Sequence, residues 1–166
     1  MPDSCQSTTG RRRWSRWNNL PANKLDYYIY RTLSYQRSGC GTSRDVVVTE
    51  TFNNLAPASG LPILVTERFD YPRFPVKPGD DRLLLDYYAT RGAQLSSISV
   101  NGKPATAGVE TDLGHPIFRT ELELPRGQTQ TVVWHLTEPA GTGSPLIVAQ
   151  PGSTPVPVTV FDQPCD

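Results

Sequence analysis

Short stretches of alternating apolar and polar residues, separated by turn residues, make up most of this chain. In the clearest stretch, residues 115–124, Phe118 and Leu122 fall on one face of an extended strand. Arg119 and Glu121 fall on the opposite face. This period of two residues is typical of a β-strand with one buried and one solvated face. The pattern predicts a chain built mainly from strands.

A second stretch, RDVVVTETFNNLAPASGLP at residues 44–62, joins a β-branched run to a break rich in Asn, Pro, Ser and Gly. Such a run predicts a strand that ends in a polar turn. Two phases fit this strand, because its inward side is formed either by Val46, Val48 and Phe52 or by the alternate positions between them. Further along the chain, the Asn-Gly pair at residues 101–102 is a strong signal for a hairpin turn.

Residues 23–35 fit both a helical and a strand spacing, but their aromatic and β-branched content favours a strand from about residue 28. No other segment predicts a helix, and turn signals recur throughout. The expected strands lie at about residues 28–35, 44–52, 63–68, 82–89, 94–100, 115–124, 129–137, 146–150 and 156–161. Eight or nine short strands predict an all-β fold, an immunoglobulin/fibronectin-like antiparallel β-sandwich, with a jelly roll as the alternative.

The first 22 residues differ from the rest in composition, because four arginines alternate there with Trp14 and Trp17. One interpretation is an arm that binds anionic lipid or nucleic acid through charge and aromatic contacts. The other is a disordered lead-in, or the remnant of an upstream region, with solvated charges. Four arginines form a thin cluster, so we favour the second. We therefore expect a single domain over residues 23–166.

Length and charge narrow the function classes only slightly. The 166 residues suffice for one domain with its own core. Sixteen basic and sixteen acidic residues balance, so net charge gives no argument for binding nucleic acid. No apolar stretch is long enough to span a membrane, and the first residues do not form a secretory signal. Taken alone, the chain would be cytoplasmic, unless it is part of a longer protein.

Three cysteines, Cys5, Cys40 and Cys165, show no CxxC spacing, so a zinc site is not expected. They are either three free thiols in a reducing compartment, or Cys40 and Cys165 form a disulfide in an oxidising one. The residues themselves leave this choice open.

No motif for nucleophilic, metal-dependent or phosphate chemistry occurs. The two histidines, His115 and His135, have no partner at a supporting spacing. Asp70, Asp81 and nearby carboxylates are interspersed with arginine and lysine, a mixture that favours solvated ion pairs over a calcium site or a catalytic acid–base pair. We expect no catalytic residue, no metal and no cofactor, and hence a protein that is not an enzyme.

Tyrosines offer a further candidate for ligand recognition. Six tyrosines could form a flat face on which sugar rings stack. The main candidates are Tyr28, Tyr30, Tyr71 and Tyr87, and the others are Tyr27 and Tyr88. Alternatively, neighbouring tyrosines alternate between core and rim, as amphipathic side chains do in small sandwiches. We favour the alternation and keep carbohydrate binding as the alternative function.

Several turn motifs resemble one family of uncharacterised, membrane-anchored cell-surface proteins of high-GC Gram-positive bacteria. The resemblance covers about residues 23–166 and corresponds to the C-terminal region of those proteins. The motifs are NKLDYY at 23–28, NNLAPASGLP at 53–62, VNGKP at 100–104, ETDLGHPIF at 110–118 and LPRGQT at 124–129. The family's membrane helix and large upstream region are not among these 166 residues.

The resemblance implies an extracytoplasmic β-sandwich that serves as a structural or interaction module of the cell envelope, without catalytic residues to carry over. It also implies a disulfide between Cys40 and Cys165, with Cys5 left unpaired. Partners would be an envelope polysaccharide or another surface protein.

Overall fold

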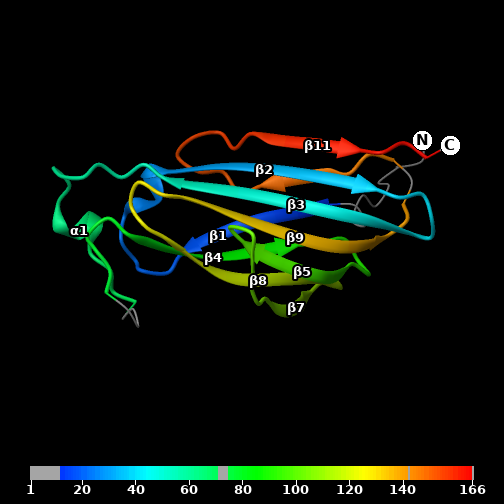
Figure 1. The fold of residues 1–166 in the computed structure, drawn as a ribbon, viewed down its shortest axis with the longest axis horizontal. Helices are drawn as coiled ribbons and strands as arrows, with labels where there is room; N and C mark the ends of the chain where they lie inside the picture. Colours follow the sequence, from blue (N-terminus) through cyan, green and yellow to red (C-terminus); the bar gives the residue numbers. More distant parts are fainter. Residues whose placement is uncertain (1–11, 71–74, 142, 166) are drawn as a thin grey trace, which may run out of the picture.

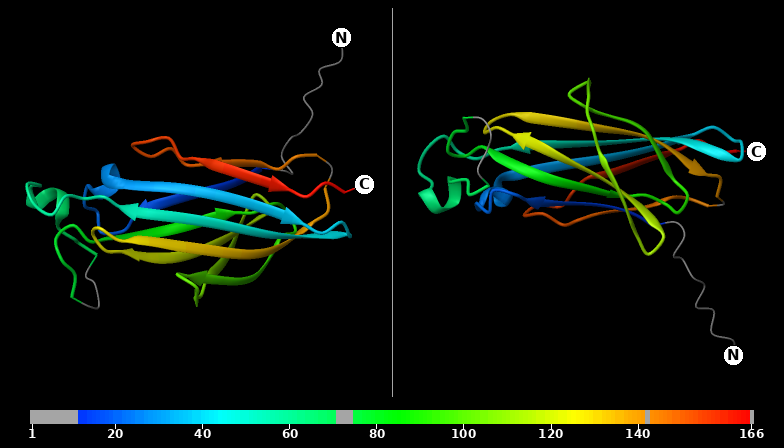
Figure 2. Two further views of the ribbon diagram at one scale, coloured as in Figure 1. Left: turned by 45° about the horizontal axis from the view of Figure 1, so that its top comes forward. Right: turned by 90° about the horizontal axis from the view of Figure 1, so that it is seen from below.

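The computed structural model describes residues 12–70, 75–141 and 143–165. The chain folds into two packed β-sheets, which Figure 1 shows in one view and Figure 2 shows from two further directions. The strands are β1 (Arg12–Asn19), β2 (Ile29–Ser38), β3 (Ser43–Asn54), β4 (Asp81–Tyr88), β5 (Gln94–Val100), β6 (Lys103–Pro104), β7 (Gly108–Asp112), β8 (His115–Leu124), β9 (Thr129–Pro139), β10 (Leu146–Ala149) and β11 (Val158–Asp162). The helical elements are one 3-10 turn, η2 (Leu25–Tyr28), and one short helix, α1 (Ile63–Thr66).

The order of strands is β10-β1-β4-β8-β7 in one sheet and β11-β2-β3-β9-β5-β6 in the other. The predicted all-β sandwich is therefore confirmed. Two details differ from the prediction. The described residues form eleven strands rather than eight or nine, and the outer pairs β1–β10 and β2–β11 run parallel, so both sheets are mixed.

The alternation in β3 resolves the phase that the sequence left open. Val46, Val48 and Phe52 face inward and are buried. Glu50 shares their face and is buried as well, although an isolated carboxylate would be costly there. The opposite side of β3 is only half-buried.

The core between the sheets contains two large aromatic side chains at its centre. The rings of Tyr87 on β4 and Trp134 on β9 stack with centroids 6.3 Å apart, and both are fully buried. Aliphatic residues from both sheets fill the space around them. Because each buried side chain of this size contributes about 1.5–3 kcal/mol, this core is the main stabilising element.

The predicted hairpin at residues 101–102 is present. Asn101 and Gly102 have φ values of 50° and 75°, as a type I′ turn requires. The turn pairs Val100 with Lys103 and begins the short strand β6.

The predicted disordered lead-in is wrong for residues 12–19. They form β1, which lies between β10 and β4. Arg13, Ser15 and Trp17 point inward and are buried, so these residues belong to the domain. The sequence pattern did not reveal this strand, because most of its inward-facing residues are polar and the usual apolar–polar alternation is missing. Residues 1–11 lie outside the described part of the chain.

The predicted strand at residues 63–68 is also wrong. Pro62 precedes α1, and the Val65 and Glu67 N–H groups donate to the carbonyls of Pro62 and Ile63. Proline is well suited to the start of a helix because it lacks the donor that would be unpaired there. One short strand, β7, was missed because its residues are all exposed and show no apolar alternation.

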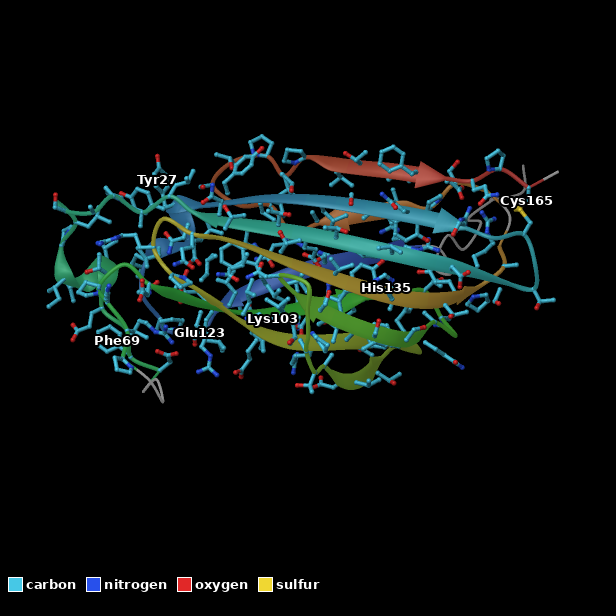
Figure 3. The ribbon with its side chains drawn as sticks, viewed as in Figure 1. Tyr27, Phe69, Lys103, Glu123, His135 and Cys165 are labelled. Atoms are coloured by element: carbon cyan, nitrogen blue, oxygen red, sulfur yellow. A yellow bond between two sulfur atoms is a disulfide. The ribbon has the colours of Figure 1, made fainter. Side chains whose placement is uncertain are left out.

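The two ends of the sandwich have different structures. Figure 1 places α1 and the turn η2 at one end, and the end of β11 at the other. Figure 3 shows Tyr27 near the first end and Cys165 at the opposite one.

Candidate ligand-binding pocket

The four tyrosines proposed as a ligand face do not form one. Tyr87 lies in the core, because the alternation of β4 turns it inward. Tyr28 is half-buried and Tyr30 is exposed on β2. Tyr71 lies outside the described residues. The predicted face is therefore wrong as a set.

A pocket of about 440 Å³ lies instead where the end of β1, the turn η2 and the segment after β10 meet. The side chains that line the pocket are uncharged apart from one carboxylate, and two of these side chains are aromatic. The lining residues are Trp17, Asn18, Asn19, Asp26, Tyr27, Gln150, Pro151, Gly152 and Ser153.

Tyr27 is the most prominent wall of this pocket, with 72% of the residue exposed. Its ring meets that of Tyr28 edge-on, with centroids 5.2 Å apart. Its carbonyl accepts a hydrogen bond from Ser153 Oγ at 2.8 Å. These contacts hold Tyr27 at the boundary of the pocket, where most of the residue is exposed. Aromatic walls with a few placed polar groups are typical of small-molecule sites.

Gln150 connects the segment after β10 to strand β1. Its side-chain Oε1 accepts a hydrogen bond from the Trp17 N–H at 3.0 Å, and its own N–H donates to the carbonyl of Ser15 at 2.8 Å. The pocket wall is thus held by hydrogen bonds on both sides of this residue.

Asn19 and Asp26 line the inner side of the pocket, and Asn23 connects to them by hydrogen bonds. Asn19 Nδ2 donates to Asn23 Oδ1 at 2.7 Å and to Asp26 Oδ1 at 3.2 Å. Asn23 Oδ1 also accepts from the Leu25 N–H at 3.1 Å, which positions the start of η2. Burial raises the pKa of Asp26, and the Asn19 hydrogen bond partly offsets this.

Asp81, at the start of β4, lies close behind this wall and is fully buried. Its Oδ1 accepts from the Arg82 N–H at 2.8 Å, whereas Oδ2 has no hydrogen-bond partner within the described residues. The same holds for Asn23 Nδ2 and Asn19 Oδ1. These three atoms are enclosed within the protein, where the Asn23 side chain lies against the Asp81 carboxylate.

Burial raises the pKa of Asp81 to about 7, from a usual value near 3.8. The folded state consequently holds a proton between about pH 4 and pH 7 that the unfolded state has released. Stability should fall as pH rises through this window, by at most about 1.4 kcal/mol per pH unit. We expect Asp81→Asn to remove this dependence and to be more stable than the parent protein at pH 8, in urea titrations at pH 5, 6, 7 and 8. Equal slopes for both proteins would contradict the expectation.

Two buried ion pairs lie in the interior farther along the sandwich, one between the two sheets and one between neighbouring strands of the same sheet. Arg13 on β1 pairs with Glu138 on β9, which also accepts from the Tyr35 hydroxyl at 3.0 Å. Arg31 on β2 pairs with Glu50 on β3. All of these side chains are enclosed, so they stabilise the packing of the sheets and do not face a ligand.

The other ionisable side chains that the sequence analysis considered either have partners within the protein or lie on its surface. Asp70 pairs with Arg68, which lowers the pKa of Asp70. His115 Nδ1 lies 2.9 Å from the carbonyl of Ala89, and His135 is exposed on β9. Within residues 12–70, 75–141 and 143–165, no three His, Cys, Asp or Glu side chains form a group that could hold a metal ion.

A disulfide joins Cys40, after β2, to Cys165, after β11, with their Cα atoms 5.5 Å apart. The pairing that the resemblance implied is thus present. Arg37 Nε and Arg44 Nη2 reach Asp162 and Gln163 beside it. A disulfide of this kind fits an extracellular, oxidising location. None of the helices in the described residues has the length and apolar character needed to cross a bilayer.

A second hollow, of about 630 Å³, follows β2 and β11 near the disulfide. Its charged lining residues, Arg37 and Asp162, already pair with each other. The hollow therefore offers fewer unsatisfied groups than the pocket beside Tyr27.

Comparison with known proteins does not assign the chain to a family. No protein-family model matches the chain, and no curated protein matches it. Among solved structures, the chain is similar to a "putative nutrient binding protein" of Legionella pneumophila subsp. pneumophila str. Philadelphia 1, at 10% identity and a TM-score of 0.40. The match covers 74% of this chain and 42% of that protein, so this chain spans less than half of its length.

Proposed function

We propose that this chain is a non-enzymatic, extracytoplasmic interaction module that binds carbohydrate in the pocket beside Tyr27. The observation that carries the proposal is the exposed Tyr27 ring above a wall of amide and carboxylate groups. The apolar C–H faces of sugar rings pack against the electron-rich faces of aromatic rings. Sugar hydroxyls both donate and accept, as do the side chains of Asn18, Asn19 and Gln150.

A binding role fits this pocket better than hydrolysis. Canonical glycoside cleavage uses two carboxyl groups roughly 5–10 Å apart. Asp26 is the one carboxylate among the residues that line the pocket. A location outside the cytoplasm is supported by the disulfide between Cys40 and Cys165. An envelope polysaccharide is the partner that best combines this location with the chemistry of the pocket.

The test is a glycan array followed by calorimetry on the sugars that bind. Tyr27→Ala should weaken binding at least about tenfold, which corresponds to about 1.4 kcal/mol of lost stacking. Tyr30→Ala is the matched control, because Tyr30 is also an exposed tyrosine, 39% accessible, but does not line the pocket. Equal losses in the two variants, or no binding to any glycan, would refute the proposal.

A further inference from the structure

Trp14 is an exposed tryptophan on a strand that is paired on both sides. It lies on β1, which has β10 on one side and β4 on the other, yet 53% of its surface is accessible. Tryptophan is highly buried on average. The other two tryptophans of the chain, Trp17 and Trp134, follow that tendency and are buried. An exposed tryptophan suggests contact with a ligand where it belongs to a contiguous apolar patch.

The neighbours of Trp14 across the sheet extend its apolar surface. Trp14 lies opposite Val148 on β10 and opposite Tyr88 on β4. Side chains in such opposed positions have Cβ atoms roughly 5 Å apart. The three side chains therefore form one continuous row on the outer face, with exposed Leu146 beside it.

The row is held rigidly on its β4 side. The Arg16 guanidinium lies 5.1 Å from the centre of the Tyr88 ring, and Arg16 Nε donates to Asp86 Oδ2 at 2.9 Å. Arg119 Nε holds the other oxygen of Asp86 at 2.6 Å. A surface that is ordered before binding loses less entropy when a ligand attaches.

The charge that this surface presents to solvent is positive. The Asp86 side chain is fully buried beneath its arginines, whereas Arg16 remains 41% exposed. Arg12, two residues before Trp14 on the same face, is exposed and makes no ion pair with the described residues. A ligand that covers Trp14 would meet cationic groups on both sides of the indole.

The outer face of β1 leads from Trp14 directly to the pocket. Arg12, Trp14, Arg16 and Asn18 alternate with the buried positions of β1, so they share this face. Asn18 lines the pocket. Four residues of extended strand span about 13 Å, so Trp14 lies beyond the reach of a single sugar bound beside Tyr27.

We propose that the outer face of β1 and β10 is a second subsite, and that the two subsites together bind an anionic polysaccharide along its chain. A sugar ring stacks on Trp14, and carboxylate or phosphate substituents lie beside Arg12 and Arg16. This inference rests on the proposed carbohydrate pocket. It specifies the ligand as extended and acidic.

The test compares oligogalacturonates of two and ten sugars, with cello-oligosaccharides of the same lengths as neutral controls. We expect the acidic decamer to bind at least about tenfold more tightly than the dimer, since two linked contacts act together. Its affinity should fall with added salt. Acrylamide quenching of tryptophan fluorescence should decrease on binding, because Trp14 is the exposed tryptophan.

Trp14→Ala should abolish the advantage of the decamer while leaving dimer binding unchanged. Arg12→Gln, at an exposed position, should reduce acidic but not neutral decamer binding. Equal affinities for dimer and decamer would overturn this inference and leave the pocket standing. Failure of every oligomer to bind would overturn the pocket as well. Capture by phosphatidylglycerol vesicles that depends on Trp14, without decamer binding, would assign the face to lipid and also overturn the inference.

Discussion

Replacing Glu50 by alanine is expected to lower the free energy of unfolding by about 3–5 kcal/mol, the usual cost of removing one partner of a buried ion pair. The Glu50 carboxylate accepts hydrogen bonds from Ser15 Oγ at 2.8 Å and Trp134 Nε1 at 3.1 Å, and it pairs with buried Arg31. In the variant, the guanidinium remains enclosed without its anion. Urea denaturation followed by circular dichroism measures the loss.

Glu121→Ala is the matched control, because Glu121 also pairs with an arginine, Arg82, but is 52% exposed. Exposed pairs contribute about 0–1 kcal/mol. The double variant Arg31→Met, Glu50→Gln removes both charges together and should recover part of the loss. If Glu50→Ala costs no more than Glu121→Ala, the buried pair is not a main support of the packed sheets.

Cys40→Ser is expected to have the second largest effect, a loss of about 2–5 kcal/mol. The disulfide closes a loop with a sequence separation of 125 residues, and removing it increases the freedom of the unfolded chain. The free energy of unfolding of this variant should match that of the reduced parent protein. Intact mass should show two hydrogen atoms gained when the oxidised parent protein is reduced.

Cys5→Ser controls for the loss of a thiol as such, since the bond joins the other two cysteines. We expect it to leave the stability and the reductant-dependent mass change intact. A parent protein purified from an oxidising compartment with the same mass before and after reduction would contradict the disulfide. It would also weaken the case for an extracytoplasmic location.

Much of the fold could be predicted because the strands near its centre have simple alternation. In β8 and β9, most inward positions are apolar and most outward positions are polar, so the period was sufficient to predict both strands. In β1 the inward positions include Arg13 and Ser15. Their burial depends on Glu138 and Glu50, more than thirty residues away in sequence. Local pattern cannot reveal a partner that only the folded chain supplies.

The pocket was not predicted, for a related reason. Its walls come from β1, η2 and the segment after β10, and each contributes ordinary polar residues without a motif. The predicted tyrosine face does not form as a set, although Tyr27 was among the tyrosines considered. Tyr87 is drawn inward by the phase of β4, whereas Tyr27 is exposed by the 3-10 turn. Trp17, which lines the pocket, lies in the Arg/Trp segment that the sequence analysis set aside, and this was the available signal.

The two parallel strand pairs, β1–β10 and β2–β11, also limit the order in which the strands of the domain can assemble. Residues 12–15 pair with residues 146–149, and residues 33–37 pair with residues 158–162. Such distant contacts make a chain of high contact order, which folds slowly compared with one built from neighbouring hairpins. During synthesis, β1 must wait for β10 to emerge before it has neighbours on both sides. We therefore expect closure of the sandwich to be a late event, with the bond to Cys165 later still.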